Sequence, residues 1–307
     1  MSEMENKFTH PIIKGQPHTK MMPPGTALVL EGGGTRGFYS CGVFEAFMEK
    51  GIMFPYIVGV SAGAANAYSY ISGQPKRSRL IVEKYVGNKK YVSYRNVFCH
   101  GSLFGYDFIF KTIPGEHIYW DREIYENTAT RFIAGATDCA TGQPTWFEKD
   151  ELLETMEPAI ASCSVPLVAK IVKYKGLELL DGGITAPIPI EKSLEDGNSF
   201  HVVVLTRNHG YRQTPFRHKR ILRLFYRKYP ALIEAMLTRH DMYNRQLELC
   251  EQLEHENKAM IIRPKLPLTV SRSTRDTAKL LALYDEGHDE GREAVPVLLK
   301  ILESGLA

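Results

Sequence analysis

The sequence is poor in cysteine and has no long apolar run. Five cysteines, an odd number, are spread over 307 residues, and no two of them have the C-x-x-C spacing. A disulfide framework or a zinc site is therefore not expected, and a reducing compartment, the cytoplasm, fits better. The first 25 residues lack the apolar core of a signal peptide. No stretch approaches the roughly 18 consecutive apolar residues of a membrane-spanning helix, so only peripheral contact with a membrane stays open.

Charge and composition exclude further classes of protein. The formal net charge of +3 is too small to indicate nucleic-acid binding, and no nucleic-acid partner is expected. His100, His117 and His201 lack the spacing of metal ligands, and we predict neither a metal ion nor an organic cofactor. With 44% hydrophobic and 24% charged residues the composition is that of an ordinary globular protein, in the form of one large domain or a domain with an appendage.

Short apolar runs alternate with segments of helical spacing. The runs at residues 26–30, 56–60, 131–137 and 201–206 are typical of strands buried on both faces. Because such strands are separated by helical segments, we predict an α/β fold with a mostly parallel sheet covered by helices on both faces. An antiparallel hairpin is expected around residues 175–176.

Three regions follow from these patterns. Residues 1–25 contain four prolines and are predicted to be a flexible lead-in, residues 26–206 to be the main domain, and residues 207–307 to be a mainly helical extension packed on it. Residues 87–105, rich in Tyr, Asn and Gly, are expected to form a loop or lid. The expected helices include residues 77–85, 151–162, 216–240 and 243–256, and residues 274–302 with interruptions at Gly287, Gly291 and Pro296.

A serine lies between two glycines where the second strand gives way to a helix. The segment Gly59-Val60-Ser61-Ala62-Gly63 has the G-x-S-x-G pattern, and its strand–turn–helix context is that of a nucleophile elbow. Gly59 and Gly63 remove side chains where a strained turn approaches its neighbours. Ser61 is therefore the candidate nucleophile, rather than only a helix-capping serine.

A glycine-rich turn follows the first strand. Gly32, Gly34 and Gly37 fit G-x-G-x-x-G, which dinucleotide-binding folds also use, but those folds place an acidic residue at the end of the second strand, where this chain has Val60-Ser61. Backbone N–H groups of such a turn can instead stabilise a developing oxyanion. Arg36 either adds positive charge or holds the loop in shape. The candidate oxyanion residues are Gly32, Gly33, Gly34, Arg36, Gly37 and Ala62.

A serine nucleophile needs a group that accepts its proton. Asp181 follows an apolar run and opens Asp181-Gly182-Gly183, whose glycines allow a close approach. His209 follows the strand at residues 201–206. The order Ser61, Asp181, His209 is that of a conventional triad, so a Ser–Asp dyad and a triad both stay open.

The motifs together resemble the bacterial patatin-like phospholipases. The resemblance covers residues 26–206 and rests on the glycine-rich motif at 32–37, the elbow at 59–63, the Asp-Gly-Gly motif at 181–183 and the segment at 161–166, in which Ser164 replaces the usual alanine. It implies a three-layer α/β/α catalytic domain and a Ser61–Asp181 dyad that needs no histidine. It further implies a lipid acyl hydrolase of the phospholipase A or lysophospholipase type, acting on phospholipids or other acyl esters. Acyl transfer to another acceptor and lipid binding without catalysis are the alternatives.

The last feature is a basic segment. Between Arg207 and Ile233 there are eight Lys or Arg residues and no Asp or Glu. The segment from Arg207 to Lys228 is expected either to be a solvated helix face or to contact an anionic membrane surface. A hydrolase that acts on insoluble lipids favours the second interpretation.

Overall fold

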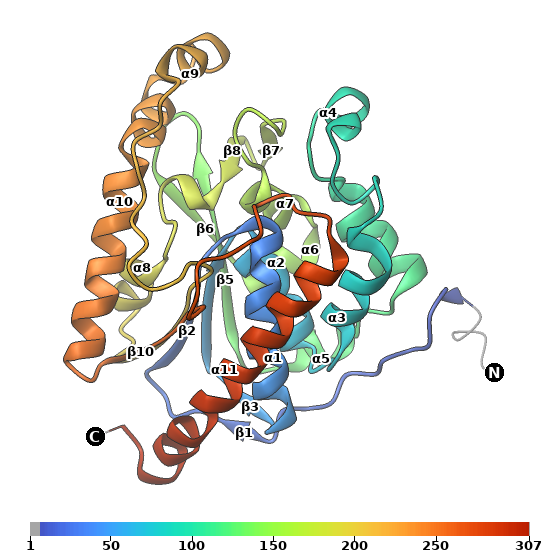
Figure 1. Ribbon diagram of the computed structural model, residues 1–307, viewed down its shortest axis with the longest axis vertical. Helices are drawn as coiled ribbons and strands as arrows, with labels where there is room; N and C mark the ends of the chain where they lie inside the picture. Colours follow the sequence, from blue (N-terminus) through green and yellow to red (C-terminus); the bar gives the residue numbers. More distant parts are fainter. Residues whose placement is uncertain (1–6, 307) are drawn as a thin grey trace.

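A computed structural model describes residues 7–306 of the chain (Figure 1). Within that range the central sheet has eight strands, in the order β10-β9-β2-β4-β5-β8-β7, with β6 also paired to β5. The first five of these run parallel, and β6 and β8 both run antiparallel to β5. The strands are β2 (Thr26–Leu30), β4 (Tyr56–Val60), β5 (Arg131–Asp138), β6 (Pro144–Glu148), β7 (Val172–Tyr174), β8 (Leu177–Asp181), β9 (Phe200–Val204) and β10 (Ala259–Ile262).

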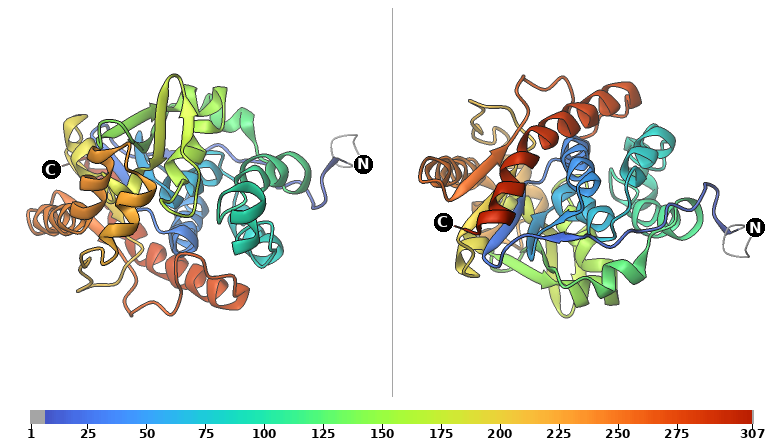
Figure 2. Two further views of the ribbon diagram at one scale, coloured as in Figure 1. Left: turned by 90° about the horizontal axis from the view of Figure 1, so that it is seen from above. Right: turned by 90° about the horizontal axis from the view of Figure 1, so that it is seen from below.

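Helices cover both faces of this sheet (Figure 2). One face packs against α1 (Phe38–Glu49) and α2 (Ala62–Ile71), and the other against α8 (Ile190–Glu195) and α10 (Pro230–His255). Every residue of β2 and β4 is buried, as expected for apolar runs between two helical layers. The predicted three-layer fold with a mostly parallel sheet and C-terminal helices is thereby confirmed.

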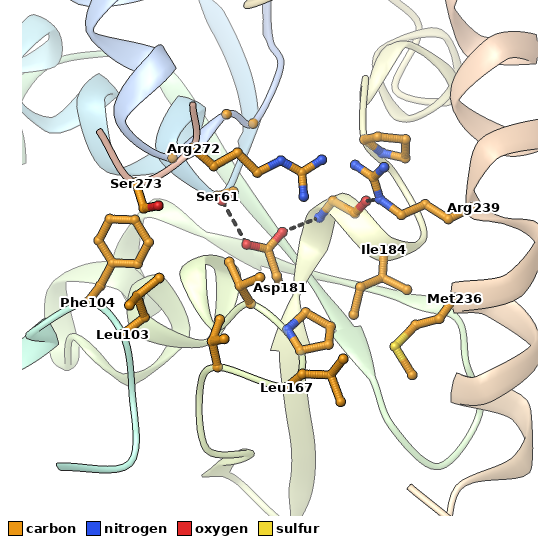
Figure 3. Close-up of a pocket in the computed structure, with 18 of the residues that line it drawn as sticks. Ser61, Leu103, Phe104, Leu167, Asp181, Ile184, Met236, Arg239, Arg272 and Ser273 are labelled. Atoms are coloured by element: carbon orange, nitrogen blue, oxygen red, sulfur yellow. Dashed lines mark hydrogen bonds between the residues drawn. The ribbon is translucent and has the colours of Figure 1, made fainter. Parts of the chain in front are cut away.

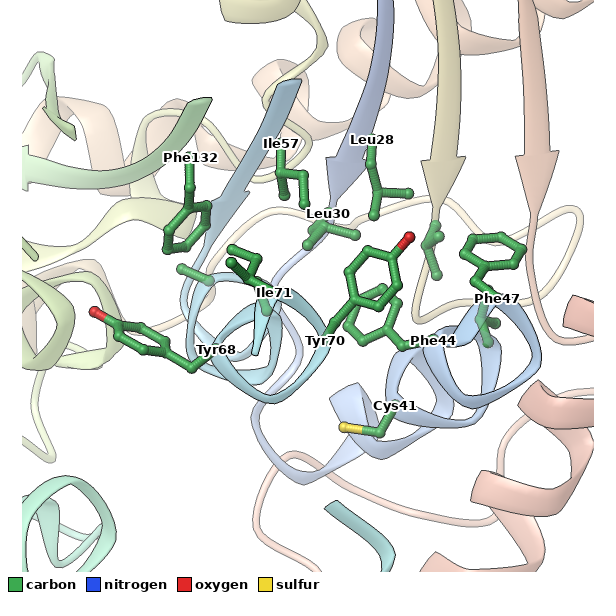
Figure 4. Close-up of a cluster of buried hydrophobic side chains, with 14 of the residues drawn as sticks. Leu28, Leu30, Cys41, Phe44, Phe47, Ile57, Tyr68, Tyr70, Ile71 and Phe132 are labelled. Carbon is green, nitrogen blue, oxygen red and sulfur yellow. The ribbon is translucent and has the colours of Figure 1, made fainter. Parts of the chain in front are cut away.

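The larger core lies between the sheet and α1 and α2 (Figure 4). Leu28 and Ile57 of the strands face Phe44 of α1 and Tyr70 of α2. The rings of Phe44 and Tyr70 stack with centroids 5.1 Å apart, and the Tyr70 hydroxyl donates a hydrogen bond to the Ile52 carbonyl at 2.7 Å. Burying each such side chain is worth about 1.5–3 kcal/mol. This core therefore fixes the two helices whose N-terminal ends follow the glycine-rich turn and the elbow.

The long helix α11 (Thr277–Ser304) packs across α1 (Figure 1). The predicted interruptions at Gly287, Gly291 and Pro296 are wrong, because the helix is continuous through all three. A Cβ atom at Gly287 would overlap the Tyr39 carbonyl, and one at Gly42 would overlap the Tyr284 carbonyl, so these glycines are where the two helices touch.

Polar side chains complete the α1–α11 contact. The Tyr284 hydroxyl donates to Glu45 at 2.9 Å, and Tyr39 donates to Glu290. On either side of Pro296, Val295 and Leu298 are buried. Packing on α1 therefore outweighs the low helix propensity of glycine and proline.

Three further expectations differ from the structure. The predicted helix at 151–162 is two helices, α6 (Lys149–Glu154) and α7 (Glu157–Cys163), because Pro158 starts a new one. The helices predicted at 216–240 and 243–256 are α9 (Lys219–Phe225) and one long α10, which starts at Pro230. The predicted loop at 87–105 contains α4 (Tyr94–His100). The helix predicted at 77–85 is present as α3 (Arg77–Ile81), continued by the π-helical η3 (Val82–Val86).

The lead-in is more ordered than its composition indicates. Its residues 1–6 lie outside the described part of the chain, but β1 (Lys20–Met21) pairs with β3 (Ile52–Met53) and Met22 is buried. Gln74 donates a hydrogen bond to the Ile13 carbonyl at 2.6 Å. Backbone and side-chain hydrogen bonds therefore connect residues 9–22 to the body, while the flexibility of the lead-in stays a prediction. The C-terminal region, residues 207–307, also contributes a strand to the sheet, because β10 pairs with β9. The predicted boundary between the main domain and this region, at residue 206, stays a prediction.

No helix within residues 7–306 has the length and apolar character needed to cross a membrane. The remaining α5 (Arg122–Asn127) packs beside α2, and the π-helical segment η4 (Phe108–His117) precedes it.

We expect Gly42→Ala to destabilise the protein by about 1–3 kcal/mol, because the added methyl group overlaps the Tyr284 carbonyl and forces α1 and α11 apart. Helix propensity alone predicts the opposite, a gain of up to about 1 kcal/mol. Urea unfolding measures the difference. Gly115→Ala is the control, because a Cβ atom there meets nothing within 4 Å. A Gly42→Ala protein as stable as the wild type would contradict the packing described for these helices.

Candidate active site

Ser61 lies on a strained turn between β4 and α2. Its φ of 53° and ψ of −130° are rarely adopted by residues other than glycine, and such strain is typical of functional sites. A Cβ atom at Gly59 would lie 2.9 Å from the Ala64 nitrogen, and one at Gly63 would lie 2.7 Å from the Leu30 carbonyl. The glycines predicted to flank a tight elbow therefore do occupy positions without room for a side chain.

The buried side chain of Ser162 connects this turn to β5. The Ser61 backbone N–H donates to the Ser162 hydroxyl at 2.9 Å, and that hydroxyl donates to the Gly135 carbonyl at 2.7 Å. Ser162 belongs to the segment that carries the family resemblance, but the sequence alone assigned it no role. Because the Ser61 N–H is already paired, it is not free to bind a ligand.

Ser61 and Asp181 meet directly (Figure 3). The Ser61 Oγ donates a hydrogen bond to Asp181 Oδ2 at 2.7 Å, and the Gly183 N–H donates to Asp181 Oδ1 at 2.7 Å. Ser61 directly follows β4 and Asp181 is the last residue of β8, and these two strands are separated in the sheet by β5 alone. A Cβ atom at Gly182 would overlap the Gly135 carbonyl of β5, so the second residue of the Asp-Gly-Gly motif is what lets this turn approach.

The surroundings of Asp181 act on its pKa in both directions. Burial raises the pKa above its usual value of 3.8. The hydrogen bonds from Ser61 and Gly183 and the positive charges of Arg272 and Arg239 oppose this shift without cancelling it. The carboxyl group is thus a stronger proton acceptor than an exposed aspartate.

The glycine-rich turn lies beside Ser61. Gly32, Gly33 and Gly34 line the same cavity as Ser61, and a Cβ atom at Gly32 would lie 2.8 Å from the Ser61 Cβ. Within residues 7–306 the backbone N–H groups of Gly33 and Gly34 have no hydrogen-bond acceptor. The N–H of Ala62, the first residue of α2, has no intrahelical acceptor either. Three backbone donors without an acceptor therefore belong to residues that line the cavities at Ser61.

Two residues of the predicted oxyanion set lie elsewhere. Gly37 packs against α2, where Asn66 donates to its carbonyl at 2.8 Å. Arg36 is almost fully buried and does not line the cavity; burial lowers its pKa to about 10, partly offset by Glu31. Of the two interpretations of Arg36, its position fits the one in which it holds the loop in shape.

His209 is exposed on a turn and lines a separate hollow with Arg212 and Glu251. Both Asp181 oxygens are bonded to Ser61 and Gly183, so no imidazole stands between the serine and the acid. The structure does not bring His209 together with the other two residues. Among residues 7–306 no cluster of three or more His, Cys, Asp or Glu side chains is placed to hold a metal ion.

Two groups of cavities meet at Ser61. A larger one, of about 320 Å³, contains Asp181 and the glycine-rich turn, and its walls include Leu103, Phe104, Leu167, Ile184 and Met236 (Figure 3). Two small cavities of about 60 and 80 Å³ adjoin each other on the α2 side, because they share lining residues. They lead from Ser61 toward Trp120, and they share Phe38, Ala65, Asn66, Tyr91, Ile109 and Phe110.

Two arginines of the larger cavity were not predicted. Arg239 comes from α10 and Arg272 from the segment between β10 and α11 (Figure 3). The sequence drew attention to the basic segment at 207–228 instead, because only there are the charges clustered along the chain. No local pattern marks two isolated arginines that meet in the folded protein.

Two family profiles match the chain. The profile of the patatin-like phospholipases matches residues 28–193, and a domain of unknown function, DUF6363, matches residues 229–303. The first match contains both Ser61 and Asp181.

The chain is also similar in sequence to individual bacterial proteins. The chain is 28% identical over 212 residues to the Escherichia coli protein YjjU, covering 66% of this chain and 57% of YjjU. It is 26% identical over 171 residues to the NTE family protein Rv1063c of Mycobacterium tuberculosis, covering 54% and 45%. The chain thus spans about half the length of these relatives. The crystal structure of VipD from Legionella pneumophila matches with a TM-score of 0.44 and 14% identity, covering 94% of this chain and 68% of that one.

We expect Asp181→Asn to raise the free energy of unfolding near neutral pH, by an amount on the order of 1 kcal/mol. Because burial raises the pKa of Asp181, the folded state holds that proton more tightly than the unfolded chain does. The stability that Asp181 contributes is therefore present at low pH and is lost as the pH rises through its folded-state pKa. Urea unfolding of both proteins across pH measures this. The gain should shrink toward acid pH, and a gain that is constant across pH would contradict the proposed cause.

Proposed function

This chain belongs to the patatin-like phospholipase family, whose profile matches more than half of its residues, and we propose that it is a serine-dependent lipid acyl hydrolase with a Ser61–Asp181 dyad. The observation that carries the proposal is the 2.7 Å hydrogen bond from Ser61 Oγ to Asp181 Oδ2. A nucleophile and its base must lie within such a distance for proton transfer.

In the first half of the proposed reaction, Ser61 Oγ attacks the ester carbonyl carbon while Asp181 accepts its proton. The carbonyl oxygen becomes an oxyanion and receives hydrogen bonds from the N–H groups of Gly33, Gly34 and Ala62, which have no acceptor within residues 7–306 and belong to residues that line the cavities at Ser61. Collapse of the tetrahedral intermediate breaks the ester C–O bond, and the proton on Asp181 passes to the departing alcohol. The product is an acyl-Ser61 enzyme.

In the second half, a water molecule takes the place of the alcohol. Asp181 accepts its proton, the hydroxyl attacks the acyl carbon, and the same N–H groups stabilise the second oxyanion. The proton then returns to Ser61 Oγ as the carboxylic acid departs. The raised pKa of Asp181 supports this double role, because it brings the acid closer to the pKa range useful for proton transfer.

The cavities support an acyl substrate. The small cavities on the α2 side are lined by Phe38, Tyr91 and Phe110 and begin at Ser61. An apolar path that ends at the nucleophile suits the hydrocarbon chain of the acyl group. Acyl transfer to an alcohol or thiol, rather than to water, uses the same intermediate, and product analysis with competing acceptors distinguishes the two outcomes.

The surface around the larger cavity supports contact with an anionic membrane, as the basic segment led us to expect. On α9, Leu224 is 74% and Phe225 is 66% exposed, and on α4, Tyr94 is 77% and Phe98 is 90% exposed. Figure 1 shows α9 and α4 projecting at the same end of the molecule. Leu222 of α9 and Phe104, just after α4, line the cavity itself.

The charge of α9 suits the same partner. Arg217, Lys219, Arg220 and Arg223 lie in or beside this helix, and no acidic residue occurs between 207 and 233. Exposed apolar side chains among cations are typical of segments that bind anionic lipid surfaces. We propose that α9 and α4 rest on the lipid surface with the cavity mouth between them.

Ser61→Ala and Asp181→Asn should each lower the hydrolysis of short p-nitrophenyl esters by at least about 10³-fold, because each removes a partner of the proton transfer. Ser61→Ala should also abolish covalent labelling by a fluorophosphonate. His209→Ala is the matched control and should keep the wild-type rate. A loss of comparable size in His209→Ala would favour a triad, and wild-type activity in Ser61→Ala would exclude Ser61 as the nucleophile.

The double variant Leu224→Ser/Phe225→Ser should bind vesicles of anionic lipids at least about tenfold more weakly, because two apolar side chains no longer enter the interface. Vesicle flotation measures the bound fraction. Val297→Ser on α11, where the side chain is 46% exposed, is the control and should bind like the wild type. Equal weakening in both proteins would argue against a specific docking surface on α9.

A further inference from the structure

Two guanidinium groups face the larger cavity beside the Ser61–Asp181 pair. Arg239 and Arg272 both line it, and Figure 3 shows them on the same side of Asp181. Within residues 7–306 neither arginine forms an ion pair with an aspartate or glutamate, and Asp181 is the only acidic residue of the lining. With Asp181 ionised, the cavity therefore carries an excess of positive charge.

Both arginines are fixed to the backbone that forms the site. The Arg239 Nε–H donates to the Gly183 carbonyl at 2.5 Å, which leaves its terminal NH₂ groups for another acceptor. The carbonyl of Arg272 accepts the Thr35 N–H at 2.9 Å, and the neighbouring Ser271 carbonyl accepts the Thr35 hydroxyl at 3.2 Å. Arg239 is thus attached to the Asp-Gly-Gly turn and Arg272 to the glycine-rich turn, the two turns that flank Ser61.

Arg239 is half-buried, whereas Arg272 is exposed where it lines the cavity. Keeping the half-buried charge of Arg239 beside a second cation is costly without an anion. Burial lowers the pKa of Arg239 to about 10, and the nearby charge of Arg272 contributes to the shift. Asp181 interacts with both arginines through its charge, but its single negative charge cannot neutralise two cations. Arginines without carboxylate partners and with free NH₂ groups are typical of sites that bind phosphate through paired hydrogen bonds.

We propose that Arg239 and Arg272 bind a phosphate group carried by the substrate, so that the enzyme prefers acyl esters with a phosphate close to the scissile bond, such as acylglycerol phosphates. This inference rests on the proposed acyl hydrolase function. The acyl chain then lies on the α2 side of Ser61, along Phe38 and Tyr91, and the phosphate lies in the adjoining larger cavity. The ester carbonyl is held between them at the nucleophile.

A binding experiment tests the site without any catalysis. Octyl phosphate, which has no ester, is titrated below its micelle concentration into the Ser61→Ala protein and followed by calorimetry. Adding Arg239→Gln or Arg272→Gln should weaken binding by at least about tenfold each, the loss expected for a charge-assisted hydrogen bond. Arg275→Gln is the matched control, an exposed arginine three residues further along the same segment that does not line the cavity. Equal affinity in all these proteins, or no binding to the Ser61→Ala protein, would overturn the proposal.

Inorganic phosphate distinguishes the source of the anion. It shares the group that the arginines contact but lacks the hydrocarbon chain, so it should compete with octyl phosphate only weakly. If it binds as tightly as octyl phosphate, the assignment to a lipid headgroup is wrong.

A kinetic experiment then tests selectivity. The ratio of kcat/KM for an acylglycerol phosphate to that for the monoacylglycerol with the same acyl chain should fall at least about tenfold in Arg239→Gln and in Arg272→Gln, and stay unchanged in Arg275→Gln. Arginines that only lowered the pKa of Asp181 would shift the acid limb of the pH profile for both substrates and leave the ratio as it is, which would overturn the proposal. If the wild type hydrolyses neither ester, the proposed function fails, while the calorimetry still decides the phosphate site.

Discussion

The hydrogen bond between Ser61 and Asp181 joins two turns that lie 120 residues apart in sequence, and much of the structure serves to keep them in contact. Each turn follows a buried strand, and one strand, β5, separates the two in the sheet. Gly182 leaves room for its turn to approach the Gly135 carbonyl, and Ser162 links the Ser61 N–H to β5. The hydrophobic cores on both faces of the sheet hold these strands in register. The hydrogen bond between Ser61 and Asp181 therefore depends on packing far from it.

The strands, the turn around Ser61 and the acidic residue Asp181 could be predicted because each is marked by a short local sequence pattern. An apolar run between glycines is visible in a few residues, and so are the elbow around Ser61 and the Asp-Gly-Gly motif at Asp181. The same reasoning failed for α11, where Gly287 and Pro296 favour a break when taken alone. The helix continues because α1 presents backbone at the positions where α11 has no side chain. Helix propensity describes a segment in isolation, whereas the packing of α11 on α1 depends on the residues of both helices.

Residues that meet only through the tertiary fold were beyond prediction. Arg239 and Arg272 occur in segments of ordinary composition and become neighbours because α10 and the chain before α11 both reach the cavity. Arg36 illustrates the opposite case, since its place within the glycine-rich motif suggested the cavity but its side chain is buried away from it. Whether a side chain reaches the cavity therefore depends on the orientation of its helix, strand or turn more than on its distance from a motif in the sequence.

The segment from Ser271 to Arg272 is bonded to Thr35 of the glycine-rich turn, so the C-terminal region forms part of the cavity wall. Ser61 and Asp181 lie within residues 28–193, whereas Arg239 and Arg272 both lie within 229–303, the stretch matched by a separate family profile. The Ser61–Asp181 pair and the two arginines beside it are thus contributed by segments that different family profiles describe. A change confined to residues 229–303 can therefore alter the charge of the cavity wall without altering either member of the pair.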